Sequence, residues 1–331
     1  MKIAFTRCYR LAALSMFTIA GCSGLQSQPA TLAASSSVEN PNFKASKAWV
    51  FVSDPGTSEV YIYTLPTLKL IEIVTGFTQP QGECSDNKGN VWVTDGTAQT
   101  IFEVEHSGSI GRRLSDTSGY PGGCAWNPKT GNLAVMNLLG TGSLPGAVLI
   151  YHHAAGVPNI YSNPKQFYYN FGWYDSAGNL FFDGRNANGK FMLSELPVNA
   201  VQAKSIAISG GRIYYPGLVQ WSSSYLAIGD QNCGNQTVSC IYRLSVSKTG
   251  AAIKGKIALE NSTGGQLCDL IQGVIWQGHV VGSDSDFCGS VPSATYVWPY
   301  PGGGKPTAHN AHNDSTPFGA AVSVVTGGGA P

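Results

Sequence analysis

A short strand that ends in Asp or Asn recurs six times along this chain of 331 residues. Successive ends are separated by 41, 42, 46, 47 and 54 residues. Each run follows a polar turn, as in GECSDNKGNVWVTD at 82–95 and GGCAWNPKTGNLAVMN at 122–137. The six terminal residues are Asp54, Asp95, Asn137, Asp183, Asp230 and Asp284. Repetition at a period of roughly 40–50 residues is typical of propeller blades.

Each run is followed by another apolar segment, such as EVYIYTLP at 59–66 and TIFEVEH at 100–106. Val, Ile, Tyr and Phe alternate there with polar residues between turns rich in Gly, Pro and Asn, which predicts β-strands. No stretch shows sustained helical periodicity. We therefore predict an all-β chain that folds as a six-bladed β-propeller over residues 47–325.

The first blade lacks an inner strand before its second strand, which already begins at Ala48. We predict the missing strand at the other end of the chain, because PFGAAVS at 317–323 resembles PQGECS at 80–85 and PGGCA at 121–125. A C-terminal strand would then complete blade 1 and close the ring, which removes exposed sheet edges. Residues 326–331 are expected to form a disordered tail.

The pattern P-x-G…D-x-x-G-N-[LV]-x-V-x-D resembles that of the NHL, SMP-30/gluconolactonase and streptogramin-lyase group of six-bladed propellers. The resemblance covers nearly the whole mature chain and implies the fold, but no particular activity, because propellers host unrelated functions. Streptogramin lyases use His and Glu in the late blades around Mg²⁺. Here the last blade offers His279 but no glutamate after Gln266, so the resemblance does not extend to lyase activity.

Residues 1–21 have the features of a secretory signal peptide. Three basic residues precede an apolar run that is too short to span a bilayer as a helix. The sequence IAGC at 19–22 resembles the bacterial lipobox, which predicts cleavage before Cys22 and attachment of a lipid to it. Ser23 follows, and a residue other than Asp there favours the outer membrane. Residues 22–46 are predicted to be a flexible lipidated tether that spans roughly 27 Å.

The mature chain carries 17 basic and 19 acidic residues, which gives a net charge of −2. Charged residues make up 12% of the whole chain, against about 25% in an average soluble protein. A near-neutral chain does not support nucleic-acid binding, which needs a basic face. We expect a monomer in the bacterial cell envelope that is held to the membrane by its lipid.

Six cysteines remain once Cys8 and Cys22 are set aside, and an even number in an exported chain indicates disulfides. Two of them hold the same position in neighbouring inner strands, two flank one loop, and two lie at one end of the last blade. The predicted pairs are Cys84–Cys124, Cys233–Cys240 and Cys268–Cys288, one of fifteen connectivities. The alternative is a metal or redox site, but there is no CxxC and no Cys/His cluster with zinc spacing.

The six Asp or Asn ends should gather around one mouth of the propeller channel, with Glu83 near them. Several oxygens at one mouth suit Ca²⁺, Mg²⁺ or a polar ligand. The SMP-30-like lactonases hold their metal with Glu, Asn and Asp from different blades. Glu83, Asn137 and Asp183 or Asp230 could form a similar set, although the local motifs do not match. The other interpretation is that each end caps a turn through backbone N–H groups, and repetition in every blade favours it.

Four tryptophans fall near the ends of the expected inner strands: Trp126, Trp173, Trp221 and Trp276. They could form an aromatic floor that stacks on a planar ligand. They could equally fill the wedges between blades, which is the more common role of such residues.

Signatures of catalysis are missing from the sequence, since neither a G-x-S-x-G elbow nor a P-loop occurs. This favours a non-enzymatic protein without a cofactor that binds a protein, a glycan or a small ligand, or that acts as a scaffold. The alternative is a metal-dependent hydrolase or lactonase that uses the acidic mouth.

Overall fold

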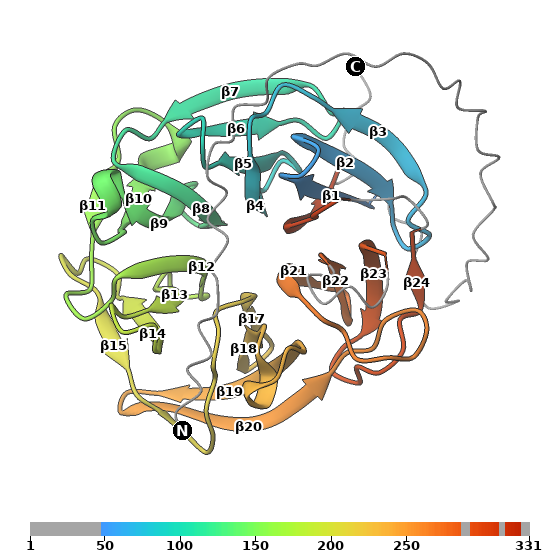
Figure 1. Cartoon of the computed structure of the whole chain (residues 1–331). Coiled ribbons are helices and arrows are strands. Elements are labelled where there is room, and N and C mark those ends of the chain that lie inside the picture. The colour runs from blue at the N-terminus through green and yellow to red at the C-terminus, as the bar shows by residue number, and fades with distance from the viewer. Residues whose placement is uncertain (1–47, 286–291, 311–314, 326–331) are drawn as a thin grey trace, which may run out of the picture. The chain divides into compact units, whose positions relative to one another are not determined.

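The computed structural model describes residues 48–285, 292–310 and 315–325. Within these ranges the strands form six sheets, five of four strands and one of five, which stand as blades around a central axis (Figure 1). The predicted all-β fold and its six blades are confirmed. No helix in the described ranges is long and apolar enough to cross a membrane. Cys22, the expected signal peptide and tether, Cys288 and the tail lie outside these ranges.

Blades 1 to 3 hold twelve strands, which follow from the innermost outward. Blade 1 contains β25 (Gly319–Val324), β1 (Ala48–Asp54), β2 (Glu59–Thr64) and β3 (Leu70–Val74). Blade 2 contains β4 (Pro80–Ser85), β5 (Val91–Asp95), β6 (Thr100–Val104) and β7 (Ile110–Ser115). Blade 3 contains β8 (Gly119–Trp126), β9 (Leu133–Gly140), β10 (Val148–Tyr151) and β11 (Asn159–Tyr161).

Blades 4 to 6 repeat this order, and blade 5 gains a short fifth strand at its outer edge. Blade 4 contains β12 (Tyr168–Tyr174), β13 (Leu180–Arg185), β14 (Phe191–Leu196) and β15 (Lys204–Ile206). Blade 5 contains β17 (Val219–Ser222), β18 (Tyr225–Asp230), β19 (Cys240–Ser247), β20 (Gly250–Ala258) and β16 (Ile208–Ser209). Blade 6 contains β21 (Leu270–Trp276), β22 (His279–Asp284), β23 (Ala294–Pro299) and β24 (Ala308–His309).

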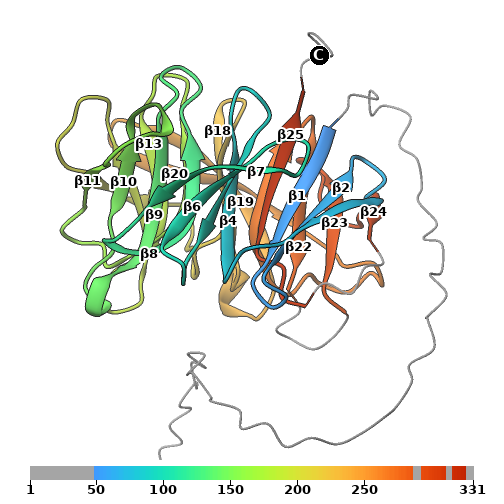
Figure 2. The same ribbon diagram turned by 90° about the horizontal axis from the view of Figure 1, so that it is seen from above.

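The C-terminal strand closes the ring as predicted. β25 pairs with β1 in antiparallel register, with Ala320 opposite Val52 and Ala321 opposite Phe51. Figure 2 shows β25 and β1, from opposite ends of the chain, side by side. Without β25 the backbone groups of β1 that face the axis would have no partner strand, so this pairing completes the innermost layer.

The hydrophobic core lies in the wedges between neighbouring blades. Between blades 1 and 2, Phe51 and Ile62 pack with Val93 and Phe102. Both faces of a second strand are therefore covered, and every residue of β5 and of β22 is buried. This explains why the second strands are continuous apolar runs whereas the outer strands alternate with polar residues.

Candidate functional site

Four of the six Asp or Asn ends predicted from the sequence are aspartates that cap the loop leading into the inner strand of the same blade. Asp95, at the end of β5, accepts hydrogen bonds from the backbone N–H groups of Thr78 (2.6 Å) and Gln79 (3.0 Å), just before β4 begins. Equivalent bonds to the loops before β25, β17 and β21 are made by Asp54, Asp230 and Asp284. Backbone donors thus occupy both oxygens of each carboxylate, as expected for structural caps.

The other two ends, Asn137 and Asp183, are not equivalent to these caps. Asp95 and Asp284 pair with Pro80 and Leu270, near the start of their inner strands. Asn137 pairs in the same way with Pro121, but its amide bonds a side chain and accepts no backbone N–H. Asp183 lies opposite an irregular stretch of β12, between Tyr169 and Gly172.

Asp183 joins two blades through its buried carboxyl group. It accepts hydrogen bonds from the backbone N–H groups of Phe171 in β12 and Gly217 before β17, both at 3.0 Å. Burial nevertheless raises the pKa of Asp183 well above its usual range, and these hydrogen bonds oppose the shift. Asn137 donates from its Nδ2 to the hydroxyl oxygen of Ser118 at 3.1 Å.

The set of Glu83, Asn137 and Asp183 or Asp230 suggested by the lactonase resemblance does not surround a common space. Only Glu83 of these residues lines the cavity on the propeller axis. Within the described parts of the chain, no group of three or more His, Cys, Asp or Glu side chains is arranged to hold a metal ion.

Two of the three predicted disulfides are confirmed. Cys84–Cys124 joins the inner strands β4 and β8 of neighbouring blades, with 5.7 Å between the Cα atoms. Cys233–Cys240 closes the loop between β18 and β19, with 5.6 Å between the Cα atoms. Cys268 is also disulfide-bonded, but its predicted partner Cys288 lies outside the described residues.

The four tryptophans near the inner strands divide between the two expected roles. All four pack against the hydrophobic clusters between blades. Two of them, Trp173 and Trp276, also line the axial cavity, where they are partly exposed. The four tryptophans therefore pack between the blades, and two of them also give the axial cavity an aromatic lining.

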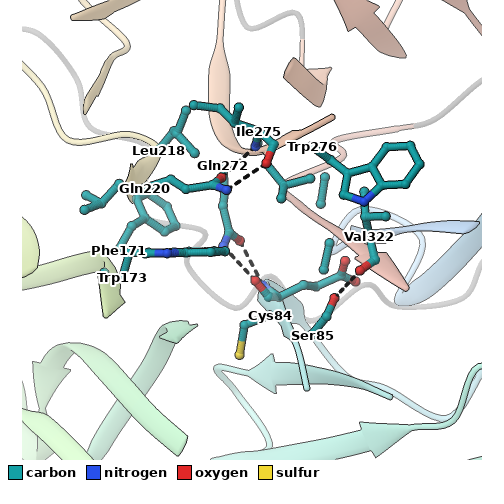
Figure 3. Close-up of a pocket in the computed structure, with 17 residues that line it drawn as sticks. Cys84, Ser85, Phe171, Trp173, Leu218, Gln220, Gln272, Ile275, Trp276 and Val322 are labelled. Atoms are coloured by element: carbon teal, nitrogen blue, oxygen red, sulfur yellow. Dashed lines mark hydrogen bonds between the residues drawn. The ribbon is translucent and has the colours of Figure 1, made fainter. Parts of the chain in front are cut away.

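The axial cavity has a volume of about 270 Å³ and lies among five inner strands, β4, β12, β17, β21 and β25 (Figure 3). Trp173, Val274 and Trp276 at one end are partly exposed, whereas Glu83 and Gln272 are buried. The cavity therefore opens at the far ends of the inner strands, with Glu83 at its inner end. The aspartate caps lie at the other face, where the inner strands begin, and do not line the cavity.

Two glutamines bridge blades across this region. The amide of Gln272 in β21 accepts from the backbone N–H of Glu83 and donates to its carbonyl, both at 2.8 Å. The amide of Gln220 in β17 pairs in the same way with the backbone of Ile275. Figure 3 shows Gln272 between Gln220 and the Cys84–Ser85 segment. A Cβ on Gly82 would lie 2.9 Å from Oε1 of Gln272, so this glycine leaves room for the crossing amide.

Glu83 departs from the repeat at its position in the inner strand. None of the other five inner strands, β8, β12, β17, β21 and β25, contains an acidic residue. The propeller architecture is therefore satisfied without a carboxyl group on its inner strands.

The carboxyl group of Glu83 is buried and unpaired. The residue is 2% exposed, and neither oxygen has a hydrogen-bond partner among the described residues. Burial raises the pKa of Glu83 well above its usual range, and the nearby backbone N–H of Ala321 only partly opposes this. A buried polar group without a partner costs free energy, and such positions are concentrated at functional sites.

Sequence reasoning selected Glu83 but missed Gln220 and Gln272. Both glutamines act on blades distant in sequence, and Gln272 contacts a residue 189 positions away. A polar residue inside the apolar inner strand LIQGVIW was the available signal, but its partner depends on how the ring closes.

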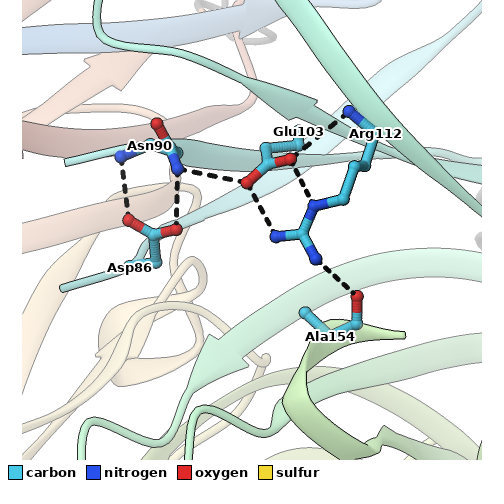
Figure 4. A network of polar contacts seen from close by, with 5 residues as sticks. All are labelled: Asp86, Asn90, Glu103, Arg112 and Ala154. Carbon is cyan, nitrogen blue, oxygen red and sulfur yellow. Dashed lines mark hydrogen bonds and ion pairs between the residues drawn. The ribbon is translucent and has the colours of Figure 1, made fainter. Parts of the chain in front are cut away.

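A second polar cluster, in the outer part of blade 2, has a structural role (Figure 4). Arg112 donates to both carboxylate oxygens of Glu103, at 2.6 and 2.8 Å, and to the carbonyl of Ala154 in blade 3 at 3.2 Å. Hydrogen bonding to Arg112 lowers the pKa of Glu103. Asn90 links Glu103 to Asp86, so every member has a partner and the cluster joins two blades.

No protein-family model matches the chain, and no curated protein matches its sequence. A protein of unknown function from Bacteroides caccae has a similar structure, with a TM-score of 0.63 at 13% identity over 84% of this chain and 99% of that one. Hydrazine synthase of Kuenenia stuttgartiensis is also similar, with a TM-score of 0.53 at 11% identity over 74% and 72%. These similarities show the fold alone. The resemblance to the NHL, SMP-30 and streptogramin-lyase group stays a prediction.

Proposed function

We propose that this protein is a non-enzymatic binding protein that holds a small ligand in the axial cavity of its propeller. The observation that carries the proposal is Glu83, whose buried, unpaired carboxyl group lines that cavity. The inner strands of the other five blades have no acidic residue, so architecture does not account for it. A concave, mostly apolar pocket with a few polar groups is typical of small-molecule sites.

The size of the cavity favours a small ligand over a protein or a glycan chain. A volume of about 270 Å³ is close to the lower end of known ligand pockets. A stable protein partner would instead need roughly 800 Å² of surface on each side. A purely scaffolding role would leave the buried carboxyl group of Glu83 without a function.

The proposal includes a location in the bacterial cell envelope, with a lipid on Cys22 and the outer membrane as the expected site. This part rests on the sequence of residues 1–46 alone. A Cys22→Ala variant should move from the membrane fraction to the soluble fraction while the propeller stays folded.

A fragment screen by thermal shift on the soluble propeller tests the binding function. Val274 lies at the partly exposed end of the cavity, so Val274→Trp should obstruct it, while Val274→Ala should leave it open. We expect fragments that raise the melting temperature of the wild type and of V274A, but not of V274W. A screen without hits, or hits that persist fully in folded V274W, would contradict binding in this cavity.

A further inference from the structure

We infer that the ligand is a small organic amine whose ammonium group pairs with the Glu83 carboxylate and whose apolar body lies against the aromatic lining. This inference rests on the proposed function and specifies the chemistry of the ligand. It follows from the charge, the hydrogen-bonding capacity and the apolar surface that the cavity presents.

The charge in the cavity comes from a single group. Seventeen residues line it, and Glu83 is the only one with a side chain that can titrate, because Cys84 is disulfide-bonded. The lining residues of β4, β12, β17, β21 and β25 include no Lys, Arg or His. A cation that stabilises the ionised carboxylate must therefore come from the ligand.

The hydrogen-bonding groups near Glu83 favour a donor as the ligand. The side-chain amides of Gln220 and Gln272 are each paired through both oxygen and nitrogen. The hydroxyl group of Ser85, two residues along β4, donates its hydrogen to the carbonyl of Val322 at 2.6 Å. Its oxygen therefore presents lone pairs, as do both oxygens of Glu83 once the carboxyl group is ionised. An ammonium group has three donors and no acceptor, which matches these acceptor oxygens.

The rest of the lining suits a compact apolar body. Phe171, Trp173 and Trp276 contribute rings, and Leu218, Val219 and Val274 are among the aliphatic side chains. Indole rings also favour cations near their faces. A cavity of about 150 Å³ can hold benzene, so a cavity of about 270 Å³ should hold a ligand of roughly ten non-hydrogen atoms.

Binding of an amine should release one proton. Burial raises the pKa of Glu83 well above its usual range, which favours the protonated carboxyl group in the empty cavity. When an ammonium ion pairs with the group, the carboxyl proton leaves to solvent and the amine keeps its own. Affinity should therefore rise with pH, by up to about tenfold per pH unit, as long as the empty site is protonated and the amine is charged.

Isothermal titration calorimetry with three matched probes tests the inference. Benzylamine, benzyl alcohol and benzoate differ mainly in charge and hydrogen bonding. The proteins are wild type and Glu83→Gln, which keeps the shape of the side chain and is neutral at every pH. We expect benzylamine to bind the wild type more tightly at pH 8 than at pH 6. We also expect its affinity for E83Q to fall by at least about tenfold, with benzyl alcohol affected by less than about threefold.

The outcomes separate this inference from the proposed function. Equal binding of benzylamine and benzyl alcohol, unchanged in E83Q, would overturn the amine assignment while supporting a ligand cavity. Tighter binding of benzoate than of benzylamine would also overturn it. If none of the three probes binds folded wild type, the amine inference fails, and the fragment screen with V274W then decides the broader function.

Discussion

At the scale of single residues, Glu83 combines three features that occur together at no other position of the six inner strands. It is acidic, it is buried, and its carboxyl oxygens have no partner among the described residues. Elsewhere the buried acids are paired: Asp95 with the backbone and Glu103 with Arg112. Burying Glu83 therefore costs free energy that no structural contact of the described residues offsets.

Replacing Glu83 with Gln should stabilise the protein increasingly as pH rises. The pKa of Glu83 is raised in the folded state, so above pH 4.5 the unfolded chain loses this proton while the folded protein keeps it. This difference removes stability from the wild type, by about 1.4 kcal/mol for each unit between the two pKa values. Urea unfolding at pH 4, 6 and 8 should show a growing advantage of E83Q. Glu105→Gln, at an exposed turn, is the control, and an equal difference at every pH would contradict the account.

At the scale of elements, the aspartate caps fix where each inner strand begins. Asp95 closes the loop between blades 1 and 2 onto β5, and its bonds to the backbone N–H groups of Thr78 and Gln79 hold the start of β4 in place. A third bond, from the N–H of Ala98, caps the turn after β5. Since β4 carries Glu83, Asp95 helps to position one wall of the cavity, although Asp95 itself does not line it.

Asp95→Ala should cost about 3 kcal/mol of unfolding free energy, because it removes a fully buried carboxylate that accepts from three backbone N–H groups. Asp175→Ala is a matched control. Asp175 also accepts three backbone N–H groups, but in a solvent-facing turn between β12 and β13, where water can replace it at a cost of about 1 kcal/mol. Chemical denaturation of both variants measures the difference, and equal costs would argue against a buried cap.

The sequence predicted the elements better than the orientation of their end residues. The acid-terminated runs and the matching Cys84 and Cys124 were sufficient to predict six blades and one inter-blade disulfide. The sequence did not show that Asp183 bonds Phe171 and Gly217 and does not cap the loop before β12. An irregularity in the pairing of β12 with β13 lies opposite Asp183, and neither residue type nor spacing reveals it.

At the scale of the whole molecule, ring closure creates the cavity. The lining residues come from five inner strands, and β25 contributes Ala320, Ala321 and Val322 from the end of the chain. Gln272 reaches from blade 6 to blade 2, past blade 1. The site therefore exists only when the first and last parts of the propeller are assembled.

Removal of residues 317–331 should abolish cooperative folding. The deletion takes away β25, which pairs with β1 along Ala48–Ser53 and covers Phe51 in the core. A control that lacks only residues 326–331 should unfold like the full propeller. Circular dichroism and size-exclusion chromatography distinguish the two, and a folded monomer without residues 317–331 would contradict closure by β25.

The central claim is that Glu83 is a buried carboxyl group that pairs with a cationic ligand. Titration of protein labelled with carbon-13 at its glutamate carboxyl groups measures this directly by NMR, with E83Q to assign the signal. We predict that Glu83 titrates well above pH 4.5 in the free protein, and that saturating benzylamine keeps it ionised across pH 6 to 8. A signal that titrates near pH 4.5, with or without the amine, would contradict the claim.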